Sequence, residues 1–214
     1  MGSKVNDARK RIGGLSDTSK MPCKSWGISA LLCTVGAFLR KAKVALKGKI
    51  SPCRVCYAQK GAYVWRSVRE AHARRLEAWK KNPNWVSDFV VAIHKQKHFR
   101  WFDSGDLQNL SMLEAIVEVA KKTPNTKHWL PTHEYGLVKE YRKKHGASLP
   151  SNLTLRVSAA FADDPPPNFA NTSTTHSREV LHDVECLAYL NDNQCGDCRN
   201  CWDSSIKNIS YKLH

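Results

Sequence analysis

The sequence predicts an α/β fold: an open or partial (β/α) barrel of roughly four to six βα units with a Cys-rich C-terminal tail. Short apolar strands alternate with amphipathic helices, a repetition that yields parallel sheets with right-handed crossovers. Polar residues follow each strand, where α/β folds place their sites. The 214 residues are too few for a complete eight-unit barrel, which needs about 250.

Two helices are predicted first. Over residues 64–81, apolar side chains recur at helical spacing, and Asn82-Pro83-Asn84 ends the helix. Basic residues occupy much of the rest of its surface: Arg66, Arg69, Arg74, Arg75, Lys80 and Lys81. A second helix is predicted over residues 85–95, with its aromatic residues in the core. The arginine face is either a solvated surface or a phosphate-contacting one.

The strands follow. Residues 99–102 predict a strand that runs into Asp103, Ser104, Gly105 and Asp106, and the capping box at residues 111–114 opens the next helix. Residues 127–131 predict a strand that ends before His133 and Glu134, followed by a helix over residues 138–144. Residues 153–159 predict the last strand, and the prolines within residues 163–167 exclude that segment from a sheet interior.

The composition is that of a globular protein, which excludes disordered, collagen-like and coiled-coil chains. Hydrophobic residues make up 42% and charged residues 25%. The longest nearly apolar run, residues 30–39, is half of the roughly 20 residues that a bilayer span needs, so we expect no membrane partner. Residues 1–20 lack the apolar region of a secretory signal, and we expect a flexible basic lead-in there. The expected location is the cytoplasm, that of the host if the protein is viral.

The charge balance suggests a polyanionic partner. The chain has 34 Lys and Arg against 19 Asp and Glu, a net charge of +15. Such an excess speeds the capture of polyanions, of which nucleic acid is the commonest in cells. The alternative is a charge that serves only solubility.

The eight cysteines lie in two groups near the chain ends. Four fall within residues 23–56, four fall within residues 186–201, and the chain between them has none. Disulfides rarely persist in a reducing compartment, so the groups indicate metal sites. We expect an α/β domain over residues 21–185 that carries the first group, with a metal-binding tail over residues 186–214 packed on it.

The C-terminal group consists of Cys186, Cys195, Cys198 and Cys201. The last three form a Cys-x-x-Cys-x-x-Cys run, which is typical of iron–sulfur clusters. Zinc, the alternative, usually takes two separated Cys-x-x-Cys pairs. Gly196 within the run allows a tight turn.

The N-terminal group consists of Cys23, Cys33, Cys53 and Cys56, of which the last two have tight ligand spacing. Cys23 and Cys33 must arrive from a separate segment. Cys33 could equally be a buried small hydrophobe.

Three motifs together resemble those of a tailed-phage protein family called gene product eighty-eight, over most of residues 20–214. They are the Cys-x-x-Cys-Tyr-Ala-x-x-Gly string at residues 53–61, the Ser-Gly-Asp string at residues 104–106 and the cysteine-rich tail. That family is similar in layout to radical S-adenosylmethionine (SAM) proteins. The resemblance implies a [4Fe–4S] cluster on Cys33, Cys53 and Cys56, with one iron open to SAM, and an auxiliary cluster in the tail. It also implies that residues 104–106 lie in the loop that binds the SAM amine.

The sequence departs from the radical SAM pattern in its thiol spacing. Nineteen residues separate Cys33 from Cys53, so the usual Cys-x-x-x-Cys-x-x-Cys signature is absent. Cys23 could occupy the fourth iron and close the site to SAM. In place of the Gly-Gly-Glu string the sequence has only Ser-Gly-Asp, whose acidic side chain is shorter.

Other residues suggest chemistry more weakly. His133 and Glu134 are candidates for acid and base catalysis, or a plain surface pair. Asp103 and Asp106 can bind a cation or a ligand amine, or cap the next helix. Two functions stay open: an iron–sulfur enzyme that acts on nucleic acid or another anionic substrate, and a non-catalytic nucleic-acid-binding protein stabilised by zinc or iron–sulfur centres.

Overall fold

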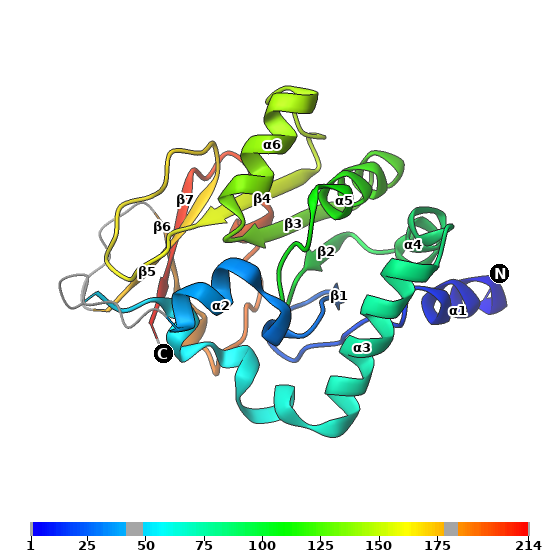
Figure 1. The fold of residues 1–214 in the computed structure, drawn as a ribbon, viewed down its shortest axis with the longest axis horizontal. Coiled ribbons are helices and arrows are strands. Elements are labelled where there is room, and N and C mark those ends of the chain that lie inside the picture. Colours follow the sequence, from blue (N-terminus) through cyan, green and yellow to red (C-terminus); the bar gives the residue numbers. More distant parts are fainter. Residues whose placement is uncertain (1, 42–48, 178–183, 214) are drawn as a thin grey trace.

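The computed structural model describes residues 2–41, 49–177 and 184–213. Within them, seven strands form one open, parallel sheet in the order β1-β2-β3-β4-β5-β7-β6 (Figure 1). The strands are β1 (Ser25–Trp26), β2 (His98–Trp101), β3 (Lys127–Thr132), β4 (Leu153–Ser158), β5 (Thr172–His176), β6 (Val184–Cys186) and β7 (Asn208–Lys212). The prediction of an open β/α fold is confirmed.

Six α-helices precede β4 within the described ranges. They are α1 (Gly2–Arg11), α2 (Thr34–Lys41), α3 (Arg66–Lys81), α4 (Trp85–Ile93), α5 (Leu110–Lys122) and α6 (Tyr135–His145). Helix α5 packs between α4 and α6, and their apolar faces meet alternate residues of β2, β3 and β4 in the main core (Figure 1). Phe99, Trp101 and Leu155 are among the strand residues buried there.

The regular strand–helix alternation extends from β1 to β4. The connection from β4 to β5, residues 159–171, contains turns and the predicted proline-rich loop. Strands β5 and β7 are rich in Thr, Ser and Asn. They lack the apolar pattern from which β2 to β4 could be predicted. Helix α1 lies in the N-terminal segment that we expected to be flexible, where the sequence predicts no helix. It packs on α4 and buries Ala8.

Two details of the predicted helices are corrected. Arg75 is buried instead of lying on the arginine face, because its guanidinium donates to the carbonyls of Gly14 and Gly27. Helix α5 is capped by Asn109, whose side chain accepts from the Met112 amide at 2.9 Å. The predicted capping box, which began at Ser111, lies inside the helix.

The cysteine-rich tail covers the second face of the sheet. Trp202 donates to the carbonyl of Phe99 at 2.8 Å and packs edge-on against Trp129. Arg156, on the face of β4 turned to the tail, is fully buried. Its guanidinium donates to five carbonyls, those of Thr172, Asn200, Cys201, Asp203 and Ile206. The tail is thus fixed to the sheet through its backbone.

Across the described ranges, none of the helices has the length and apolarity that crossing a membrane requires.

Candidate metal centres

The loops that follow β1, β2 and β3 meet at the carboxyl edge of the sheet. The Ile28 amide donates to the Ser104 carbonyl at 3.0 Å, which joins the first two loops. Gly105 has a left-handed φ of 80°, and a Cβ there would lie 2.6 Å from the Ile28 side chain. Only glycine fits this crossing. Residues 104–106 therefore lie against the segment that leads to the first thiol group.

Asp106 links the second loop to the third. Its carboxylate accepts from Thr132 Oγ1 at 2.6 Å, the His133 amide at 2.9 Å and the Leu107 amide at 2.8 Å. Burial raises the pKa of Asp106 to about 7, and the charge of Glu134 acts in the same direction. With three donors already in place, Asp106 holds the loops in position.

Cys33, Cys53 and Cys56 come together beside these loops. Cys33 directly precedes α2, and the turn Pro52–Val55, which carries Cys53 and leads into Cys56, packs on that helix. Gly36 of α2 lies next to two of the sulfurs: a Cβ on it would be 3.7 Å from Cys33 Sγ and 3.6 Å from Cys53 Sγ. The long spacing in the sequence is thus closed by the packing of α2 on the turn.

Burial raises the pKa of two thiols of the first group, Cys33 and Cys53. The pKa of Cys53 rises to about 11 and that of Cys33 rises further, and Cys56 and Asp106 add to both shifts. Arg40 lowers the pKa of both thiols. A buried, protonated thiol is a poor nucleophile, whereas a bound metal deprotonates it. These thiols are therefore better suited to ligate a metal than to attack a substrate.

The two predicted acid–base residues have different partners. Glu134 Oε1 accepts from the Val35 amide at 3.1 Å, at the N-terminus of α2. The His133 ring bonds the carbonyl of Ser158, and burial lowers the pKa of His133 to about 4. Glu134 thus fixes the helix that follows Cys33, and His133 contacts the end of β4.

Three buried polar atoms at this edge have no hydrogen-bond partner among the described residues: Asp103 Oδ1, Ser104 Oγ and His133 Nδ1. Such atoms are rare, and each costs about 1–3 kcal/mol. The Asp103 oxygen lies against the loop after β1, 2.8 Å from where a Cβ on Gly27 would be. A ligand with polar groups at this edge would satisfy them.

Cys23 lies with the C-terminal thiols and not with the N-terminal group to which the sequence assigned it. It is buried in the small core that contains Cys201 and packs against Cys186 and Cys195. The Cys195 amide donates to the carbonyl of Lys20 at 2.8 Å, which brings the tail onto the segment before Cys23. The first group therefore contains three thiols and the second contains five.

The second group is held by the sheet edge and by a tight turn. The register of β6 and β7 pairs Cys186 with Tyr211, whose hydroxyl is 3.2 Å from Cys201 Sγ. Burial raises the pKa of both Cys23 and Cys201 to about 12. Gly196 has a φ of 50°, as the predicted turn requires, and leads to the exposed Cys198.

Neither thiol group closes around one ion. Within the part of the chain that the structure describes, no three His, Cys, Asp or Glu side chains are placed to hold a single metal ion. A cluster binds each thiolate through a different iron, so its ligands stand further apart than those of zinc, at about 2.3 Å from one ion. The eight free thiols, all of them in the described ranges, therefore form no preassembled single-ion site.

A family model described as Gene product 88 matches residues 6–204, a range that includes both thiol groups. The chain belongs to the Gene product 88 family. This confirms the resemblance to that phage family. No curated protein and no solved structure matches the chain. Membership of the Gene product 88 family brings no activity with it, so the function has to be inferred from the site.

Sequence reasoning missed a polar link between the first thiol group and the sheet. The Tyr57 hydroxyl, next to Cys56, donates to the Asp103 carbonyl at 2.8 Å and accepts from Arg100 at 2.9 Å. Arg100 also lies 4.5 Å over the Trp129 ring. The available signal was Arg100 itself, a charged residue within a buried strand.

Proposed function

We propose that this chain is an iron–sulfur protein of radical SAM-like α/β architecture that acts on nucleic acid or on another anionic substrate. The observation that carries the proposal is the separation of Cys23 from Cys33, Cys53 and Cys56. A group of three thiols leaves one iron of a [4Fe–4S] cluster without a protein ligand. In radical SAM enzymes that iron takes the amino and carboxylate groups of SAM.

Residues around the three thiols suit such a cofactor. Bound cluster and SAM would supply radical chemistry, and the protein would supply binding and orientation. Asp103 and Ser104 offer unpartnered buried oxygens, among the described residues, that can accept from an amine. Asp106 and Glu134 hold the loops and α2 in register around the thiols. Arg40 provides a positive charge beside the thiolates.

The second thiol group supports a structural centre. Cys23 and Cys201 are buried in an apolar cluster, and a metal there would join the start of the chain to its end. We propose a second [4Fe–4S] cluster at this position, with zinc as the alternative metal.

A non-catalytic function is the second candidate. The tail group favours it, because metal binding at a site formed only in the folded chain contributes directly to folding. In this case the metals would stabilise a basic nucleic-acid-binding protein without any reaction. Free thiols suit either function in the reducing cytoplasm, that of the host for a phage protein.

Anaerobic reconstitution with iron and sulfide, followed by visible spectroscopy with and without SAM, tests the proposal. We expect a brown protein whose spectrum changes when SAM is added. Cys33→Ala should abolish that change while retaining the iron of the tail. A reconstituted protein whose visible spectrum does not change when SAM is added would favour the non-catalytic candidate. A colourless protein with stoichiometric zinc would contradict the iron–sulfur proposal.

A further inference from the structure

We propose that the lobe around the first thiol group, residues 30–41 and 49–69, binds single-stranded nucleic acid. This deepens the proposed function by naming its substrate class, and it rests on the nucleic-acid part of that function.

The lobe lies in an acid-free stretch of sequence. Residues 18–69 contain eleven of the 34 Lys and Arg residues and no Asp or Glu. Arg54, Lys60, Arg66 and Arg69 are exposed in the described part of this stretch. Arg66 pairs with Glu70, but both side chains are at least half exposed, and such a pair is weak enough to be displaced. Lys49 of this lobe is paired with Asp164, which lies outside the stretch. The four exposed residues named above still present positive charge to a phosphate backbone.

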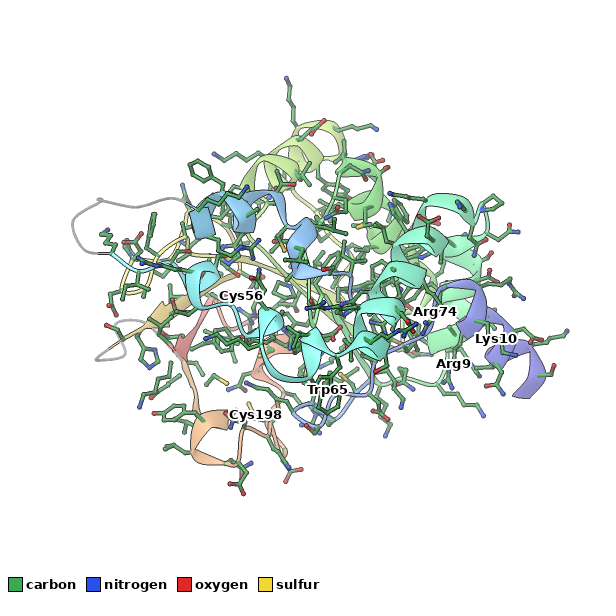
Figure 2. All side chains as sticks on the ribbon, turned by 60° about the horizontal axis from the view of Figure 1, so that its bottom comes forward. Arg9, Lys10, Cys56, Trp65, Arg74 and Cys198 are labelled. Atoms are coloured by element: carbon green, nitrogen blue, oxygen red, sulfur yellow. The ribbon has the colours of Figure 1, made fainter. Side chains whose placement is uncertain are left out.

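Three aromatic side chains stand out from the same lobe. Trp65 is 64% exposed, Phe38 is 71% exposed and Tyr57 is 52% exposed. They come from contiguous elements. The turn at residues 52–55 packs on α2, the turn at residues 57–59 packs on the turn at residues 61–64, and the latter packs on α3. Figure 2 shows Cys56 and Trp65 along this segment, before it continues into α3. All seven tryptophans fall within the described residues, and the other six are buried or half-buried.

Exposed aromatic rings among arginines and lysines distinguish a single strand from a duplex. Bases stack on aromatic side chains only when their faces are free, and each such contact contributes substantially to affinity whatever the sequence. In a duplex the faces are covered by neighbouring base pairs, and positive charge alone would account for binding. The combination at this lobe therefore matches an unpaired strand, either DNA or RNA.

The position of the lobe connects binding to the proposed chemistry. Cys33 precedes the helix that carries Phe38, and Cys56 precedes Tyr57. A strand lying over these rings would therefore pass beside the first thiol group, at the carboxyl edge of the sheet.

Tryptophan fluorescence and anisotropy titrations at low salt test the proposal. The probes are labelled oligothymidylate and oligouridylate of about 20 nucleotides, and a duplex of the same length. We expect both single strands to bind more tightly than the duplex and to quench Trp65 fluorescence. Trp65→Ala should weaken single-strand binding about tenfold, whereas Trp65→Phe should retain most of it. Lys60→Gln should lower the salt slope by about 0.7, the value for one phosphate contact on a single strand.

Matched variants control for unspecific effects. Leu190→Ala removes an equally exposed apolar side chain from the tail, and Lys121→Gln removes an exposed charge at the end of α5; neither should change binding. Duplex binding as tight as single-strand binding, unchanged by Trp65→Ala, would overturn the proposal, as would no binding at low salt. Each titration is made with metal-free and with reconstituted protein. Trp65-dependent binding by a chain that takes up no iron would refute the cluster and leave this inference standing.

Discussion

Gly36 lies against two cysteines of the first thiol group, Cys33 and Cys53, which pack where its side chain would be. It lies within α2, where alanine would favour the helix by about 1 kcal/mol. A Cβ at this position would lie 2.9 Å from Cys33 Cβ, closer than real contacts allow. The absence of a side chain therefore costs helix stability and keeps Cys33 and Cys53 close to each other.

Gly36→Ala should displace Cys33 and remove the iron bound by the first group, while the tail retains its iron. Iron and sulfide analysis after anaerobic reconstitution measures this. Gly136→Ala is the matched control, because no described atom lies within 4 Å of a Cβ at that helical position. The control should keep all iron and gain up to about 1 kcal/mol of stability. Equal iron in the two variants would contradict the assignment of Gly36.

His128 is a buried histidine whose partners require the neutral ring. Its Nδ1 accepts from Trp101 Nε1 at 3.2 Å, so its Nε2 carries the proton and donates to Thr123 Oγ1 at 2.8 Å. Burial lowers the pKa of His128 to about 3, from an ordinary value of 6.5. Between these values the unfolded chain binds a proton and the folded chain does not. Stability is therefore lost as the pH falls below 6.5.

Because of His128, the free energy of unfolding should fall by about 1.4 kcal/mol for each pH unit below about 6. Urea unfolding at several pH values between about 4 and 7 measures the slope. His128→Asn is expected to be less stable at neutral pH and to show a shallower slope below it. Parallel slopes for the two proteins would show that His128 is protonated in the folded state.

Arg156 links the sheet to the tail in a way that only its side chain provides. Five backbone carbonyls of the tail and of β5 accept from one guanidinium, among them that of Cys201. The planar group presents several donors in a fixed arrangement, which lysine cannot reproduce. The position of Cys201 therefore depends on a residue 45 positions away in the sequence.

Arg156→Met should destabilise the fold by at least about 3 kcal/mol, because it leaves several buried carbonyls without donors. Urea unfolding measures the loss, and limited proteolysis should cut first between β6 and β7. Arg74→Met provides the comparison, since Arg74 is exposed on α3 and its loss should change stability by less than about 0.5 kcal/mol. Similar stability of the two variants would refute the role given to Arg156.

The elements that could be predicted from the sequence are those with a strong apolar period. Strands β2 to β4 and helices α4 to α6 bury apolar residues at regular spacing, and the patterns indicated them. Helix α3 was also indicated by its pattern, although its apolar residues Leu76 and Trp79 are only partly buried against the core. Strand β1 has two residues, which is too short for any pattern, and β5 and β7 bury polar side chains that bond one another. The position of Arg75 depends on Gly14 and Gly27, which a helical period alone cannot reveal.

The candidate site was predicted to the extent that its ligands are close in the sequence. Cys53 and Cys56 share one turn, and the loop at residues 104–106 follows a recognisable strand. Cys23 could not be placed, because its partners lie more than 160 residues away and meet it only through the packing of the tail. The sequence suggests Glu134 as a catalytic acid or base or as a surface residue. In the structure it is buried, and its carboxylate accepts a hydrogen bond from the start of α2.

The thiols of the tail pack beside Cys23, so the segment before β1 and the tail meet on one face of the sheet. Cys23 lies just before β1, and Cys186, Cys195 and Cys201 lie around β6 and β7, at the opposite edge of the sheet order. The segment near Cys23 and the tail both pack over the sheet face that carries Trp129. A metal shared between them would constrain nearly the whole chain, and the fold should then depend on the second centre far more than on the first.

Cys23→Ala and Cys33→Ala separate the two centres. Cys23→Ala should lose the iron of the tail and unfold at lower denaturant concentration than the reconstituted parent, yet keep the spectral response to SAM. Cys33→Ala should lose that response and keep the stabilisation by iron. The matched comparison is made on metal-free protein, in which each substitution removes one thiol, from the buried Cys23 or the half-buried Cys33, and should cost a smaller amount of stability. If Cys23→Ala instead abolished the response to SAM, Cys23 would belong to the first centre, and the three-thiol site on which the proposed chemistry depends would not exist.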